Sequence, residues 1–133
     1  MVQCLLPSIK NAKNASIINI GSIYGELGPD WSMYENTNMG NPAAYGASKA
    51  GLALLTKWFS TSLAPNIRVN MISPGGILRG QSKVFVDKYV AKTPMKRMAE
   101  NYDFAGAICY FASDLSLYCT GQILTVDGGL SAW

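Results

Sequence analysis

Three short apolar segments, each ending at glycine, limit what this chain can fold into more than any other feature. Runs of this length, bounded by turn residues, are typical of buried strands. They are SIINIG at Ser16–Gly21, NIRVNMISPGG at Asn66–Gly76 and GQILTVDGG at Gly121–Gly129.

Helix-like segments separate the strands, at about Pro42–Leu63, Ser82–Ala91 and Asp103–Ser113. Strands that alternate with helices predict a parallel sheet of the α/β class with crossover helices. Since three strands are few, we expect SIINI to lie at an edge whose unpaired side favours association. The Gly- and Asn-rich stretch Gly25–Asn41 predicts a long loop.

Composition excludes several classes of function. The net charge is +3 and the basic residues form no run, so we expect no nucleic-acid partner. No apolar stretch approaches the roughly 20 residues that cross a bilayer. Three cysteines without CxxC spacing predict reduced thiols in a soluble, cytoplasmic protein.

The chain has no histidine. Ser-His-Asp and Cys-His catalysis are therefore excluded, and we expect no metal site, because zinc sites in proteins commonly use histidine. Proton transfer would have to use Tyr, Lys, Asp or Glu side chains.

Tyr45 and Lys49 are four residues apart in the helix-like segment, so their side chains share one face. An ammonium nearby favours the phenolate form of a tyrosine. Ser22 follows the first strand, where parallel-sheet proteins bind ligands. Each residue also has a simpler interpretation, a surface i, i+4 pair for the first two and a turn-capping hydroxyl for Ser22.

Glycines are placed at two further points after strands. GSIYGELG imitates a dinucleotide fingerprint, but Gly28 is followed by Pro29 rather than by a helix, so we reject that interpretation. SPGGI, residues 73–77, ends the second strand and is either a plain turn or a backbone surface that a ligand can approach closely.

Six motifs in order make the chain resemble the C-terminal half of a short-chain dehydrogenase/reductase. The resemblance implies a Rossmann-like, doubly wound parallel sheet, of which residues 1–133 are the C-terminal part of one domain. The motifs are NIGSIYG (19–25), YGASKAG (45–51), IRVNMISPGG (67–76), TPMKRMAE (93–100), FASD (111–114) and TGQILTVDGG (120–129).

The same resemblance implies an oxidoreductase that uses NAD or NADP to interconvert an alcohol and a carbonyl. Tyr45 would be the general acid/base and would also contact the cofactor, and Lys49 would promote its ionisation and hold the nicotinamide ribose. Ser22 would orient the substrate oxygen. Further residues would border the nicotinamide, with backbone at the last contacting its carboxamide: Pro74, Gly75, Gly76 and Ile77. A homodimer or homotetramer is also implied.

Two local departures from the family pattern concern the substrate and the cofactor. Ser22 and Tyr45 are 23 positions apart, more than is usual in the family, and the extra residues fall in the predicted loop. That loop resembles those of members that act on bacterial surface sugars and flagellin, so we expect it to lie over the site. Arg79 replaces a threonine that contacts the cofactor's phosphate in many members.

The largest departure is that the chain has no strand–TGxxxGxG–helix and no residue that selects between NAD and NADP. We therefore expect these 133 residues by themselves to bind nicotinamide cofactor weakly or not at all. The alternative hypothesis is a non-catalytic interaction or assembly module derived from half of such an enzyme. Intact Ser22, Tyr45 and Lys49 favour the enzyme.

Overall fold

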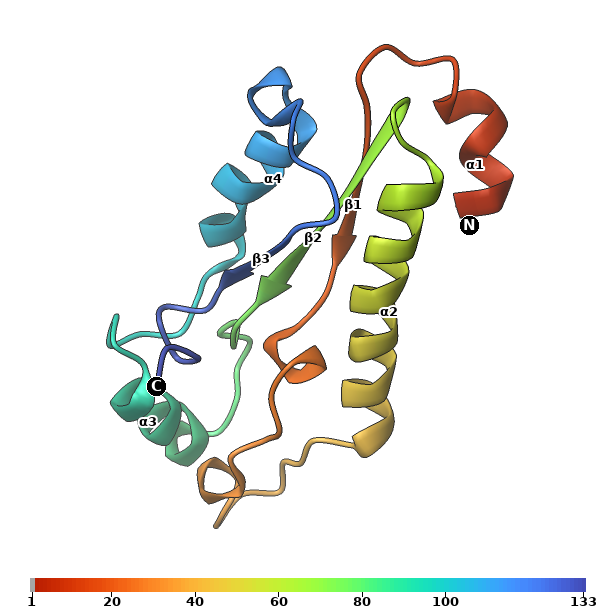
Figure 1. Ribbon diagram of the computed structural model, residues 1–133. Coiled ribbons are helices and arrows are strands. Elements are labelled where there is room, and N and C mark those ends of the chain that lie inside the picture. The colour runs from red at the N-terminus through yellow and green to blue at the C-terminus, as the bar shows by residue number, and fades with distance from the viewer. Residues whose placement is uncertain (1) are drawn as a thin grey trace.

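The computed structural model describes residues 2–133 as one parallel sheet with helices on both faces (Figure 1). This confirms the predicted α/β class and the Rossmann-like arrangement. The strands are β1 (Ala15–Ile20), β2 (Ile67–Pro74) and β3 (Ile123–Val126), and the α-helices are α1 (Val2–Ile9), α2 (Ala43–Ser62), α3 (Lys83–Lys92) and α4 (Ala105–Ala112).

Strand β2 lies in the centre of the order β1-β2-β3 and pairs in parallel with both neighbours. Ala15 is opposite Ile67 in the first pair, and Met71 is opposite Ile123 in the second. Because both its edges are paired and both its faces covered, β2 is buried at every position from Ile67 to Ser73.

Successive residues of β2 point to opposite faces of the sheet. On one face, Val69 packs with Phe59 of α2 and with Leu63, the residue that follows α2. On the other, Ile72 packs with Phe111 of α4. Figure 1 shows the sheet between these two helices. The strand therefore carries two half-cores, one for each helix.

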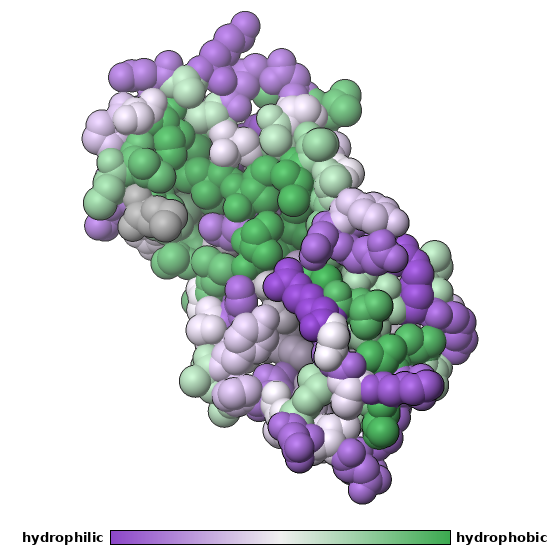
Figure 2. Space-filling view, turned by 180° about the vertical axis from the view of Figure 1, so that it is seen from behind, coloured by the Kyte–Doolittle hydropathy of each residue, from purple (hydrophilic) through white to green (hydrophobic). Residues whose placement is uncertain are grey.

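Strand β1 is an edge strand, as predicted, since within residues 2–133 it pairs only with β2. Its last residue, Ile20, is half exposed, and so is Leu5 in α1. Viewed from behind, hydrophobic residues gather in the upper part of the molecule, around the end where α1 lies (Figure 2). This apolar surface fits the predicted tendency of the edge to associate.

A third cluster of buried hydrophobic residues lies beyond the carboxyl ends of the strands, between the predicted loop and α3. The predicted loop is confirmed, with short 3-10 turns at Ile23–Gly25 (η1) and Trp31–Met33 (η2). Tyr34 from this loop packs against Phe85 of α3, with ring centroids 5.3 Å apart. Lys88 of α3 donates hydrogen bonds to two loop carbonyls. The loop is thus attached to α3 and lies beside the strand ends.

The helix predicted at 103–113 differs at its start. A 3-10 turn, Asn101–Phe104 (η3), precedes α4, because Glu100 and Asp103 form a capping box that begins the turn earlier. Phe104 and Phe111 are buried in the core, whereas Ile108 is 39% exposed. Within residues 2–133 no helix combines the length and apolar character needed to cross a membrane.

Candidate functional site

The residues singled out in the sequence lie around one open cavity of about 510 Å³ at the carboxyl ends of β1 and β2. Parallel strands direct their carboxyl ends to the same edge, and α2 begins there after the loop. The lining includes Ser22, Tyr24, Tyr34, Asn41, Tyr45, Lys49, Pro74, Gly75, Gly76, Ile77 and Arg79.

Tyr45 and Lys49 lie on one face of α2, as their spacing predicted. The Lys49 ammonium lies 5.8 Å from the centroid of the Tyr45 ring. The same Nζ donates a hydrogen bond to the Ile20 carbonyl at 2.9 Å, which fixes it at the end of β1. An ammonium has three donors, so two are left for other acceptors. The Tyr45 side chain is 42% exposed and accessible from the cavity side.

Ser22 has the capping role that the sequence left open. Its Oγ accepts a hydrogen bond from the Tyr24 backbone N–H at 3.2 Å and caps η1. It also lines the cavity although the residue is only 6% exposed. The cap uses a lone pair of the hydroxyl, so its proton can still be donated to an oxygen in the cavity.

Close packing between η1 and α2 explains two glycines in the motifs. A Cβ on Gly46 would lie 3.0 Å from the Tyr24 carbonyl oxygen, and one on Gly25 would lie 2.8 Å from the Lys49 carbonyl carbon. The neighbour of Gly46 is therefore the protein's own η1 turn.

Two tyrosines of the cavity were missed in the sequence analysis. The hydroxyls of Tyr24 and Tyr34 are 2.9 Å apart and hydrogen-bonded. Burial, together with the bond to Tyr34, raises the pKa of Tyr24 well above its ordinary value, so this hydroxyl stays protonated. The contact joins η1 to the inserted loop, and neither segment's local pattern indicates it.

The predicted cofactor wall follows β2. Gly75 N–H donates to the Val126 carbonyl of β3, and Gly76 N–H donates to the Tyr89 hydroxyl. Ile77 forms an isolated parallel bridge with Ala99. The segment is thus fixed from behind, and its other side borders the cavity with Tyr45 and Lys49.

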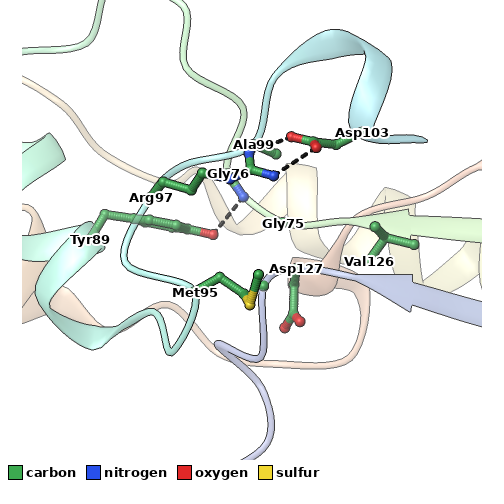
Figure 3. A pocket seen from close by; sticks show the side chains of 10 residues that line it. Gly75, Gly76, Tyr89, Met95, Arg97, Ala99, Asp103, Val126 and Asp127 are labelled. Carbon is green, nitrogen blue, oxygen red and sulfur yellow. Dashed lines mark hydrogen bonds and ion pairs between the residues drawn. The ribbon is translucent and has the colours of Figure 1, made fainter. Parts of the chain in front are cut away.

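A second, smaller cavity of about 170 Å³ lies against the same glycines (Figure 3). Arg97 and Asp103 form a two-point ion pair beside it, at 2.6 and 2.7 Å. This pair lowers the pKa of Asp103 to about 2. Among residues 2–133 no cluster of three or more His, Cys, Asp or Glu side chains could hold a metal ion.

Comparison with known proteins covers almost the whole chain. The family model described as Enoyl-(Acyl carrier protein) reductase matches residues 1–131. Post-translational flagellin modification protein A of Campylobacter coli is 39% identical over 121 residues, which is 90% of this chain and 47% of the relative. D-arabinitol 2-dehydrogenase of Candida tropicalis is 39% identical over 137 residues, which is 96% of this chain and 45% of the relative.

Solved structures give the same result. A short chain dehydrogenase from Leptospira borgpetersenii with bound NAD+ has a TM-score of 0.82 and 43% identity, over 87% of this chain and 44% of that one. A gluconate 5-dehydrogenase from Burkholderia cenocepacia, in complex with NADP and tartrate, has a TM-score of 0.85 and 27% identity. The match covers 99% of this chain and 51% of that one. The chain spans about half the length of the relatives it matches.

Proposed function

Because the chain belongs to the short-chain dehydrogenase/reductase family, we propose that it is the nicotinamide-facing half of an NAD(P)-dependent oxidoreductase that interconverts an alcohol and a carbonyl. The observation that carries the proposal is the single cavity lined by Ser22, Tyr45 and Lys49. It unites a hydroxyl, a phenol and an ammonium in a chain without histidine. Residues 1–133 are, in this proposal, the C-terminal half of one nucleotide-binding domain.

In this assignment Tyr45 is the general acid/base, because its phenol lies beside an ammonium and faces the cavity. Ser22 donates its hydroxyl proton to the substrate oxygen and so holds that oxygen near the phenol. Lys49 places its positive charge beside the phenol and keeps two donors for the ribose hydroxyls of a nicotinamide nucleotide. The bond to the Ile20 carbonyl keeps the ammonium at this position.

The wall opposite, Pro74, Gly75, Gly76 and Ile77, fits a flat nicotinamide ring. Among residues 2–133 the Ile77 N–H has no hydrogen-bond acceptor, so it is free to bind a carboxamide oxygen. The cofactor, NAD or NADP, supplies the hydride when bound. Arg79 lines the same cavity and would bind a phosphate oxygen.

A polyhydroxylated, sugar-related substrate is the finer part of the proposal. The cavity is lined by Tyr24, Tyr34 and Asn41 in addition to the groups assigned above. Such side chains bind substrate hydroxyls, and a site built to bind them rejects analogues that lack them. The relatives named for D-arabinitol and gluconate support the same class.

A homodimer or homotetramer in the cytoplasm completes the proposal. Helix α2 presents Leu54 and Trp58, which are 69% and 60% exposed, on the face away from the sheet. Apolar side chains of this size on a helix are typical of protein interfaces. Three cysteines without disulfides fit a reducing compartment.

The test uses the full-length native protein with NAD+ or NADP+ and D-arabinitol, D-gluconate or cyclohexanol, following absorbance of the reduced cofactor. We expect Tyr45→Phe to lower kcat by about 10² to 10⁴. Tyr118→Phe, at a fully exposed tyrosine, is the matched control and should be neutral. Equal activity of the two variants would show that Tyr45 is not the acid/base. No turnover with any pair, but retained self-association, would favour the assembly module.

A further inference from the structure

The wall that borders the proposed nicotinamide site is fixed by hydrogen bonds on its far side. Gly76 N–H donates to the Tyr89 hydroxyl at 2.5 Å (Figure 3). The Gly76 carbonyl accepts from Ala99 N–H at 2.9 Å, and Leu78 N–H donates to the Ala99 carbonyl at 2.8 Å. Three polar groups of the wall, two on Gly76 and one on Leu78, are therefore directed away from the larger cavity.

This arrangement determines where the next peptide groups point. In extended backbone, neighbouring residues direct their polar groups to opposite sides. Ile77 lies between the groups bound to Ala99, so its own N–H and carbonyl point the other way. Its carbonyl accepts from the Gln81 side chain at 2.7 Å, and its N–H is left for a ligand.

Tyr89 can act as a rigid support because it is held on all sides. It is 2% exposed, and its ring packs 5.9 Å from that of Phe85. A Cβ on Gly76 would lie 2.7 Å from the Cζ of Tyr89, so only glycine allows this approach. Burial raises the pKa of the Tyr89 hydroxyl, so the group stays neutral.

We infer that Tyr89 is a positioning residue of the oxidoreductase: its hydroxyl holds the Gly76 peptide so that the Ile77 N–H faces the nicotinamide carboxamide. The inference rests on the proposed function, because it presupposes that a nicotinamide occupies the larger cavity. Tyr89 acts through the backbone and does not line that cavity itself.

The second support of the wall, Ala99, is fixed by a separate ion pair. Arg97 binds Asp103 with two nitrogens, and Asp103 also accepts from the Glu100 N–H at 2.7 Å. Residues 97–100 are thereby held across the back of the wall. Loosening this pair should disturb the same amide as removing the Tyr89 hydroxyl, to a smaller extent.

The experiment measures dissociation constants by calorimetry for NAD+, NADP+ and their thionicotinamide analogues, in which sulfur replaces the carboxamide oxygen. Sulfur is the weaker acceptor, so the native full-length protein should prefer the oxygen form. Tyr89→Phe should weaken binding of the oxygen form by about threefold to tenfold. The ratio of the dissociation constants of the sulfur and oxygen forms should therefore fall toward one. Tyr118→Phe, the matched control, should keep both values.

A purely structural role for Tyr89 would lower the melting temperature and leave the preference unchanged, and that result would overturn the inference. A native protein without any preference would overturn it as well, since the Ile77 amide would not contact the carboxamide. No binding of any dinucleotide would instead refute the proposed function. If Tyr89→Phe does not fold, Arg97→Lys replaces it in the same measurement. We expect it, too, to weaken binding of the oxygen form and to reduce the preference for that form. An unchanged preference would overturn the inference.

Discussion

Replacing Gly25 with alanine should separate η1 from α2 and disturb the site from outside the cavity. The added Cβ would lie 2.8 Å from the Lys49 carbonyl carbon and 3.0 Å from the Ala50 nitrogen, both backbone atoms that cannot rotate away. Ordinary contact begins at 3.4 Å, so the two segments must separate by about 0.6 Å. The turn capped by Ser22 would move relative to the helix that carries Tyr45.

Two opposing effects set the size of the change. Overpacking of this kind lowers the free energy of unfolding by about 1 to 3 kcal/mol. Replacing glycine also restricts the unfolded chain, which raises the free energy of unfolding by about 0.4 to 1 kcal/mol. The net loss in free energy of unfolding should be about 1 to 2 kcal/mol. For a chain of this size that lowers the melting temperature by about 3 to 10 °C.

The matched control is Gly28→Ala, three residues further along the same loop. No atom lies within 4 Å of the position that its Cβ would occupy, so only the stabilising effect on the unfolded chain remains. Circular dichroism melts should therefore shift in opposite directions, downward for Gly25→Ala and upward for Gly28→Ala. A Gly25→Ala protein that melts at or above the native temperature would refute the packing argument. In the full-length enzyme we also expect Gly25→Ala to lower turnover about tenfold.

Three further changes test other contacts. Arg97 holds the pKa of Asp103 at about 2, below its usual 3.8. The ionised Asp103 therefore stabilises the folded protein above about pH 4, and this stabilisation is lost as the pH falls toward 2. Asp103→Asn should make the melting temperature depend less on pH between these values. Thr56→Val leaves the partly buried Asn19 amide without its 2.8 Å acceptor at the buried Thr56 and should lower the free energy of unfolding in urea by about 1 to 3 kcal/mol, whereas Thr56→Ser should restore most of it. Lys49→Met should weaken calorimetric NAD(P)+ binding at least about tenfold while the melting temperature changes little, and unchanged affinity would contradict the ribose assignment.

The elements could be predicted because their signals are local. Apolar runs that stop at glycine marked all three strands, and the helix expected at about Pro42–Leu63 is α2, Ala43–Ser62. The edge position of β1 followed from the number of strands. The last helix was expected to begin at Asp103, whereas α4 begins at Ala105 and follows a 3-10 turn, Asn101–Phe104, that the capping box of Glu100 and Asp103 starts.

The lining of the larger cavity was predictable to the extent that it belongs to motifs. Ser22, Tyr45, Lys49 and the segment after β2 line it together, since strand ends converge at one edge of a parallel sheet. Their chemical roles remain predictions. Tyr24 and Tyr34 could not be found in this way, because their contact depends on how the inserted loop packs against α3.

By itself the sequence determined the α/β class, the order of strands and helices, the exclusion of histidine chemistry and the residues that meet at the strand ends. These depend on periodicity, on glycine and proline positions and on composition, which are properties of short stretches. Only the tertiary structure decided that Tyr89 supports Gly76 and that Gly25 and Gly46 are packing glycines. It also decided that the Ile77 amide has no acceptor among residues 2–133. Such contacts join residues whose separation in space no local pattern encodes, because they arise when whole elements pack together.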